Sequence, residues 1–150
     1  MTYQEEQAEE FEELKRADHL LFVSLKYTKT IDVIKNIIRR LINAYDYAII
    51  RALTKLKEKN KIKDIPLSPI SRAEVLRDLT KKKIEMLDFL ELYFSLKNID
   101  RAEYTKKEEY RKNVTLTVMQ DDEVIAINIP KLHEFYKKTK EFVNYVKENF

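Results

Sequence analysis

The chain has 150 residues and a net charge of +3, with 44% hydrophobic and 37% charged residues. This length and apolar content fit one folded domain over residues 1–150 with its own hydrophobic core, and they exclude a disordered chain. Cysteine and glycine are both absent. Their absence excludes disulfides, thiolate metal sites, thiol nucleophiles and the glycine-rich loops that bind phosphate groups.

The composition and the first residues bear on where the protein works. Abundant Lys, Glu and Ile without Cys are typical of thermophile proteins. The start of the sequence, MTYQEEQAEEFEE, is acidic and unlike a signal or transit peptide. The longest apolar run, Leu20 to Leu25, is too short to span a bilayer. We therefore expect a soluble, cytoplasmic protein. Since no cofactor-binding motif occurs in the sequence, we expect no cofactor.

The charges are unevenly distributed along the first part of the chain. Residues 1–27 carry seven acids and three bases, whereas residues 28–65 carry ten bases and four acids. Two neighbouring helices of opposite charge attract each other, so this pattern does not require a binding site. The adjacent carboxylates of the first segment, such as Glu9 with Glu10 and Glu12 with Glu13, are expected to face solvent at the start of a polar helix.

Two long helices are predicted in the first half of the chain. Residues 5–27 have apolar side chains at helical spacing, including Phe11, Leu14 and Leu21. The second helix begins near Thr30, whose side chain is a suitable N-cap. Its apolar face is too wide for a single partner, so we expect this helix to lie at the centre of a bundle.

A third helix follows the lysine-rich connection KLKEKNKIKDIPLSP. Ser71 and Glu74 have the spacing of a capping box, which places the N-cap at Ser71. Helical periodicity then continues to about Asn98. The polar segment NIDRAEYTKKEEYRK is interpreted as a short helix or a loop.

The side-chain period then changes from helical to alternating. Val114, Leu116 and Val118 alternate with threonines, and after the acidic tip QDDE isoleucines alternate with smaller residues. This pattern predicts a β-hairpin at about 113–129, followed by a helix that starts near Pro130. An isolated hairpin is only marginally stable, so it must cover a helix face or pair with a second copy. The predicted fold is mainly α, a four-helix bundle with one β-hairpin inserted before the C-terminal helix.

Polar residues follow one stripe of the second helix at spacings of four, seven and three residues: Asp32, Asn36, Asn43 and Asp46. Because such spacings return to one side of a helix, the stripe lies beside the apolar face. It is interpreted either as a solvated edge or a set of hydrogen bonds between helices, or as a polar ligand pocket between helices that includes Arg39 or Tyr27.

Basic residues cluster at two places in the sequence. One region holds Arg39, Arg40 and the lysines from Lys55 to Lys63, and the other holds Lys81, Lys82 and Lys83. Each is interpreted either as solvated surface or as a contact for nucleic-acid phosphates. Tyrosines, which stack on bases in many nucleic-acid-binding proteins, do not alternate with these clusters in the sequence.

The sequence offers little support for a metal site. It has two histidines, and neither His19 nor His133 has a second ligand at metal-binding spacing. His19 is expected to be partly buried against a neighbouring helix. We therefore predict no metal centre and no catalytic residue.

The second helix, TIDVIKNIIRRLINAYDYAI, together with the order of the helices, resembles the bundles of the HEPN family. Members of that family are small prokaryotic helical proteins that are often dimeric and often cleave RNA or associate with nucleotidyltransferases. Their catalytic signature is an arginine followed four to six residues later by a histidine. This chain lacks the signature, since Arg16 precedes His19 by three residues. The resemblance therefore implies a non-catalytic role.

A helix, a hairpin and a C-terminal helix in that order also resemble winged-helix DNA-binding proteins, although acids at the hairpin tip would repel phosphate. The function that we expect is a non-enzymatic interaction or scaffolding protein of an intracellular prokaryotic type that forms a homodimer. The alternative is a nucleic-acid-associated protein that binds RNA or DNA. A third possibility is an enzyme with a small-molecule pocket near Asp46.

Overall fold

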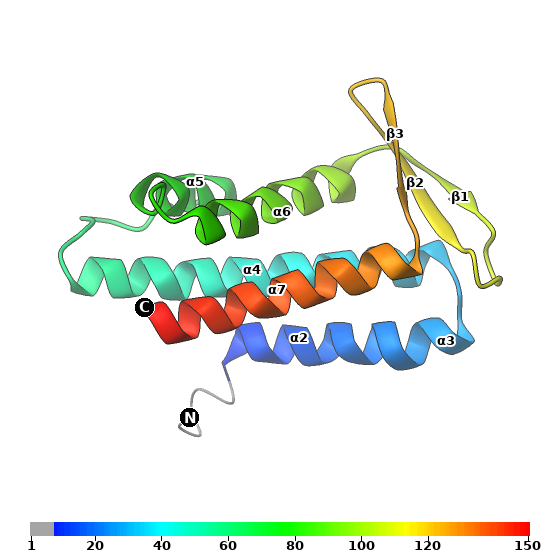
Figure 1. The fold of residues 1–150 in the computed structure, drawn as a ribbon, viewed down its shortest axis with the longest axis horizontal. Helices are drawn as coiled ribbons and strands as arrows, with labels where there is room; N and C mark the ends of the chain where they lie inside the picture. The colour runs from blue at the N-terminus through cyan, green and yellow to red at the C-terminus, as the bar shows by residue number, and fades with distance from the viewer. Residues whose placement is uncertain (1–7) are drawn as a thin grey trace.

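The computed structural model describes residues 8–150. The protein is mainly helical and carries a small antiparallel sheet (Figure 1), which confirms the mainly α class. The elements in chain order are α2 (Glu9–His19), the π-helical turn η1 (Leu20–Ser24), α3 (Leu25–Tyr27), α4 (Ile31–Glu58), α5 (Pro69–Leu79), α6 (Ile84–Arg101), β1 (Tyr104–Lys107), β2 (Thr115–Gln120), β3 (Glu123–Ile127) and α7 (Ile129–Asn149).

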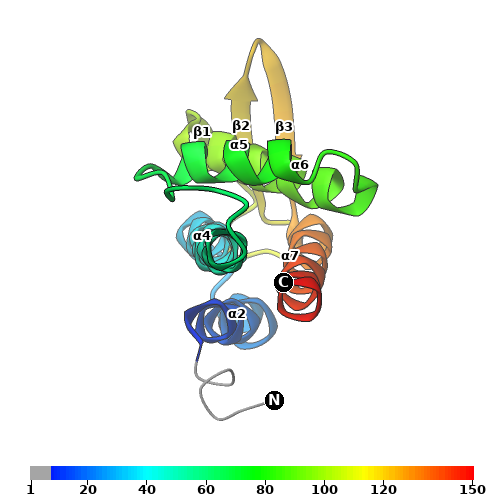
Figure 2. The ribbon, with the colours of Figure 1, turned by 90° about the vertical axis from the view of Figure 1, so that its left-hand side faces the viewer.

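Helix α4 lies at the centre of the molecule. It contacts α2, α7, α5 and α6, and the view along its axis shows α2 below it, α7 beside it and α5 with α6 above it (Figure 2). Twelve of its residues are buried, which agrees with the wide apolar face of its sequence. The neighbouring helices can therefore bury their own apolar faces against one common element.

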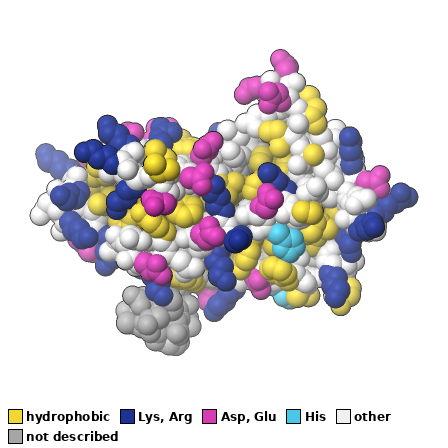
Figure 3. All heavy atoms as spheres, viewed as in Figure 1, with side chains coloured by type: hydrophobic (Ala, Val, Ile, Leu, Met, Phe, Trp, Pro, Cys, Tyr) yellow, Lys and Arg dark blue, Asp and Glu magenta, His cyan; other side chains and the backbone are white. Residues whose placement is uncertain are grey.

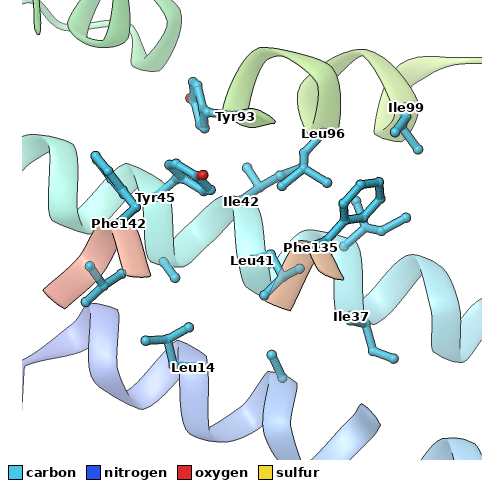
Figure 4. Packing of buried hydrophobic residues seen from close by; sticks show 14 of the residues in the cluster. Leu14, Ile37, Leu41, Ile42, Tyr45, Tyr93, Leu96, Ile99, Phe135 and Phe142 are labelled. Carbon is cyan, nitrogen blue, oxygen red and sulfur yellow. The ribbon is translucent and has the colours of Figure 1, made fainter. Parts of the chain in front are cut away.

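Three buried aromatic side chains join α4, α6 and α7 (Figure 4). The rings of Tyr45 and Phe142 stack with their centroids 4.6 Å apart, and the ring centroid of Tyr93 lies 5.4 Å from that of Tyr45. The Tyr45 hydroxyl donates a hydrogen bond to the carbonyl of Phe89 at 2.9 Å. Its polar atom is thus satisfied inside the core, where an unpaired hydroxyl would be costly.

Side-chain caps begin two of the helices. The Val33 N–H donates to Thr30 Oγ1 at 3.4 Å, so the predicted N-cap of α4 is confirmed. The cap of α5 is Ser68, whose Oγ accepts from the Ser71 N–H at 3.1 Å, and the predicted cap at Ser71 is wrong. Pro69 explains the difference, because proline favours the first helical turn and holds the preceding residue extended.

The predicted third helix is divided into two in the structure. Helix α5 ends at Leu79 and α6 begins at Ile84. Between them, Thr80 Oγ1 donates to the carbonyl of Leu76 at 2.6 Å, and three exposed lysines follow. Leu79 before these lysines and Met86 after them have helical spacing, so the sequence suggested a continuous helical face that the structure does not have.

The sequence did not predict strand β1, which lies in the segment interpreted as a short helix or a loop. All four of its residues are exposed, so its side chains show no alternation between core and solvent. The strand pairs with β2 through the backbone, with Tyr104 opposite Val118 and Lys107 opposite Thr115. Backbone pairing of this kind leaves no signal in the hydrophobic pattern.

Strands β2 and β3 occupy the alternating segment and pair antiparallel, with Gln120 opposite Glu123. The connecting residues Asp121 and Asp122 have φ angles of 51° and 65°, as a type I′ turn requires. Aspartates here adopt the positive φ that glycine would supply in other chains. The buried side chains of this segment join the helical core, and they are Val114, Leu116, Val118 and Ile127.

Buried carboxylates fasten α2 to α4. Glu10 and Glu13 are only 3% and 5% exposed, so the expectation that the paired carboxylates face solvent is wrong for these two. Glu10 is bonded to Arg51, and Glu13 Oε2 accepts from Arg40 at 3.3 Å. Glu5 and Glu6 lie outside the described residues. The acidic first segment and the basic second helix therefore attract each other through specific ion pairs.

We expect Glu13→Ala to lower the free energy of unfolding by about 2 kcal/mol, because it leaves a partly buried arginine without its counter-charge. Arg40 Nε is already buried without a hydrogen-bond partner among the described residues. Urea unfolding followed by circular dichroism measures the change.

The matched control for this prediction is Glu12→Ala. Glu12 is partly exposed, and within residues 8–150 it pairs only with the exposed Lys15 at 3.5 Å. Its loss is expected to cost less than about 0.5 kcal/mol. Equal costs for the two variants would contradict the structural role of Glu13.

Candidate interaction surfaces

The polar stripe of α4 lies partly against α6. The Tyr93 hydroxyl donates to Asp46 Oδ1 at 2.6 Å, and Arg39 Nε donates to Asp100 Oδ1 at 3.3 Å. Asn36 and Asn43 are partly buried, whereas Asp32 is exposed in the first turn of α4. Asp46 and Arg39 thus make bonds between helices, as one of the two interpretations of the stripe proposed.

Asp46 is the carboxylate of this stripe with the most unusual environment. Burial raises its pKa above the ordinary value of 3.8, while the hydrogen bond from Tyr93 and the charges of Lys97 and Arg72 oppose that rise. The two surface hollows described below are lined by residues outside the stripe. A ligand pocket at Asp46 stays a prediction.

The two basic clusters lie at different places. Arg40 is bound to Glu13 between α2 and α4, and Arg39 is paired with Asp100. Lys81, Lys82 and Lys83 form the connection between α5 and α6, where Lys83 Nζ lies 5.7 Å from the centroid of the Phe150 ring. Figure 1 shows this connection near the C-terminus, far from the N-terminal part of α4 that carries the arginines. The two arginines and the three lysines of this connection therefore do not form one continuous surface, whereas Lys55 of the first region lines a hollow together with Phe150, close to Lys83.

Both histidines lie on the surface, one at the end of α2 and the other in the first turns of α7. His19 is exposed, so the expectation that it is partly buried is wrong. His133 is partly buried and its ring meets that of Phe22 edge to face at 4.9 Å. Within residues 8–150, no three His, Asp or Glu side chains are grouped so that they could hold a metal ion.

Exposed apolar side chains gather near the junction of α2 and α7. The π turn η1 keeps Leu21 buried but leaves Phe22 50% and Val23 44% exposed. The ring of Phe22 also lies 6.0 Å from that of Tyr136, whose pKa is raised to about 12 by burial and by the charge of Asp18. Exposed apolar side chains that gather in one patch mark interaction surfaces. We call Phe22, Val23, His133 and Tyr136 the aromatic patch.

The outer edge of β3 has no partner strand among the described residues. Gln120 and Glu123 flank the two-residue turn and form a hydrogen-bonded pair. Because backbone N–H groups alternate in direction along a strand, those of Val124 and Ala126 point away from β2. The N–H of Met119, which lies opposite Val124, points away from β3 and donates to the Glu103 carbonyl at 3.0 Å, in agreement with this assignment. The β3 edge therefore presents free backbone donors and acceptors to solvent.

The surface hollows are open and lined by charged as well as apolar residues. One of about 300 Å³ lies between α6 and α7 and contains the ion pair of Asp88 with Lys138 at 2.6 Å. Another of about 340 Å³ lies between α2 and α7 and is lined by Phe11, Tyr136 and Lys140, among others. Neither brings together a nucleophile and a base at hydrogen-bonding distance, which an acyl-transfer site would need.

Comparison of the chain with models of protein families, with curated proteins and with solved structures finds no match in any of the three. None of the helices in residues 8–150 has the length and apolar character needed to cross a bilayer. Arguments about function therefore depend on the surfaces described above.

The raised pKa of Asp46 predicts a pH dependence of stability. Between about pH 3.8 and the raised pKa of Asp46 in the folded protein, the folded state binds more protons than the unfolded state. The free energy of unfolding therefore falls as the pH rises through this range. We expect the wild-type protein to lose stability over this window relative to Asp46→Asn. Urea unfolding at a series of pH values measures the difference.

The control for the pH prediction is Tyr93→Phe. Since the hydrogen bond from Tyr93 lowers the pKa of Asp46, its removal is expected to move the decline to higher pH. Parallel pH profiles for the wild type and Asp46→Asn would contradict the prediction.

Proposed function

We propose that the protein is a non-enzymatic interaction protein that forms a homodimer through the free edge of β3. In this proposal the four main helices form one four-helix bundle, and the hairpin of β2 and β3 is the arm through which two copies join. Support comes from the position of the hairpin, which extends beyond α5 and α6 (Figures 1 and 2). The observation that carries the proposal is the unpaired edge of β3, on which Glu123 is the one charged residue.

The two edges of the sheet differ in charge. The exposed edge strand β1 carries Lys106 and Lys107, and lysines on an edge discourage pairing with another chain. From Val124 to Ile129 the chain has no charged residue, no proline and no bulge. Beyond Glu123 at its start, β3 is therefore suited to pairing, because no charge, proline or bulge opposes the approach of a second strand.

Antiparallel pairing of β3 with its own copy satisfies the symmetry of a homodimer. The same residues of both copies meet across a two-fold axis, so each free amide finds the carbonyl of the partner strand. The combined sheet has six strands. Val124 and Met119, which are 61% and 47% exposed, then lie side by side in both copies on the face of the sheet that points away from the helices.

A single pair of short strands buries less area than a stable dimer usually does, which is about 1,600 Å² in total. Additional surface is available close by. Helix α7 begins two residues after β3, and its first turns carry His133 and Tyr136 of the aromatic patch. Figure 3 shows hydrophobic side chains on the hairpin and around a histidine on one face of the molecule.

We also propose that the protein is related to dimeric, non-catalytic members of the HEPN family. The sequence of α4 and the order of the helices support this relationship.

We expect the wild-type protein to have a solution mass near twice 18.1 kDa. Ala126→Pro removes an outward-directed amide without removing a bond to β2, so it blocks the edge and leaves the hairpin intact. It is expected to weaken dimerisation by at least about tenfold, because several backbone hydrogen bonds are lost together. Light scattering after size-exclusion chromatography, over a range of concentrations, measures the mass.

The control is Ala126→Val, which keeps the amide and has a higher preference for strands, and which is expected to remain dimeric. Circular dichroism confirms that both variants are folded. A monomeric wild type at high concentration would remove the proposal. A proline variant that dimerises as well as the wild type would move the interface away from β3.

A further inference from the structure

Exposed tyrosines and basic side chains gather at the end of the molecule formed by the connection between α3 and α4, by β1 and by the loop after β1. Figure 3 shows dark blue basic side chains along this right-hand end. We call it the lysine–tyrosine end. Its members are Tyr27, Tyr104, Tyr110, Lys26, Lys29, Lys35, Lys106, Lys107, Arg111 and Lys112.

Two contacts join segments that are far apart in the sequence. The Tyr110 N–H donates to the Lys29 carbonyl at 2.6 Å, and Glu109 Oε1 accepts from the Ile31 N–H at 3.0 Å. The second contact places a carboxylate at the N-terminus of α4, where the helix dipole favours it. The loop after β1 is therefore fixed to the start of α4, and Tyr110 is held close to the segment that carries Tyr27.

The tyrosine rings at this end are available to a ligand. Tyr27 and Tyr110 are 78% and 75% exposed, and Tyr104 is 39% exposed. Lys35 Nζ lies 4.2 Å from the centroid of the Tyr104 ring, and Lys26 Nζ lies 5.9 Å from that of Tyr27. Aromatic faces and cations thus occur together, although they are separated in the sequence.

The loop that carries Tyr110 has an unfavourable backbone. Glu108 and Tyr110 have φ angles of 57° and 65°, although neither is one of the residues, glycine, asparagine and aspartate, that adopt such angles readily. A bulky residue at positive φ costs free energy and persists only where the surrounding contacts impose it. Because the Tyr110 side chain is mostly exposed, its own packing does not repay this cost. Backbone strain that presents an exposed aromatic ring supports a binding role.

Basic residues outnumber acidic ones here. The two segments 26–36 and 103–113 carry seven bases and four acids, Asp32, Glu103, Glu108 and Glu109. Glu108 is paired with Arg111 at 3.6 Å, and Glu109 with Lys106 at 3.9 Å besides its bond to α4. Lys26, Lys107 and Lys112 are exposed. The remaining positive charge can therefore meet an anionic ligand.

We infer that the lysine–tyrosine end binds single-stranded nucleic acid. Unpaired bases stack on exposed aromatic rings, and the surrounding lysines contact the phosphates. Bases inside a duplex are not accessible to such rings, so a single strand fits better than a double helix. The site lies beside β1, at the opposite edge of the sheet from β3, so a dimer joined through β3 leaves it open. Neither of the basic clusters selected from the sequence belongs to it.

The first test measures the binding of fluorescein-labelled oligouridylate and oligothymidylate of about 12 nucleotides by fluorescence anisotropy. Tyr27→Ala together with Tyr110→Ala is expected to weaken binding by about tenfold or more, the loss of at least one stacked base. Tyr27→Phe with Tyr110→Phe keeps both rings and is expected to bind within about twofold of the wild type. Binding of either probe supports the inference, whichever of the two binds more tightly. Tighter binding of the oligouridylate than of the oligothymidylate indicates contacts to the 2′-hydroxyl groups.

The second test compares two basic surfaces of equal charge. Replacing Lys26, Lys107 and Lys112 by Gln is expected to reduce the slope of log affinity against log salt, by about 0.7 for each phosphate that is no longer neutralised. Replacing Lys81, Lys82 and Lys83 by Gln removes the same charge elsewhere and is expected to leave binding within about twofold. Circular dichroism checks the fold of each variant, all of which change exposed side chains.

Three results would overturn the inference: no binding of either probe at low salt, unchanged affinity in the double alanine variant, or equal losses in the two lysine variants. A duplex of the same length that binds as tightly as the single strand would also contradict it. Ala126→Pro separates this inference from the proposed dimer. It is expected to change the solution mass while each chain still binds the oligonucleotide.

Discussion

The burial of α4 among the other helices is the constraint on which the rest of the structure depends. A long helix with a wide apolar face cannot be left in water, so α2, α6 and α7 each pack against it. Its polar positions are also used for bonds between elements. Glu13 reaches Arg40 from α2, Tyr93 reaches Asp46 from α6, and the carboxylate of Glu109 caps the first turn. One helix thus contacts the four other long helices and the middle strand of the sheet.

The small sheet extends this arrangement into two different surfaces. Its middle strand, β2, buries Leu116 and Val118 in the helical core, which fixes the sheet to α4 and α6. The outer strands are consequently presented on opposite sides. The edge of β3 is free and carries one charged residue, Glu123, whereas β1 carries two lysines and adjoins the start of α4. Self-association and binding of a polyanion are proposed for separate edges because their chemistry differs.

Sequence reasoning succeeded where a signal is local. The cap at Thr30 and the alternating segment that holds β2 and β3 depend on a few neighbouring residues, and both are found in the structure. It failed where two local signals compete, since Pro69 moves the cap of α5 to Ser68, and where a lysine-rich turn interrupts an apparently continuous helix. It also missed β1, which pairs through its backbone without burying a side chain.

By itself, the sequence determined the helical class, the central helix and the change of period before the last helix, because side-chain periodicity reports which faces must be buried. Only the tertiary structure decided that Glu10 and Glu13 are buried and that Tyr27 and Tyr110 lie on one end of the molecule. The physical reason is that these environments are made by partners far along the chain. A charged or aromatic side chain has the same local pattern whether its counterpart is water or a distant segment.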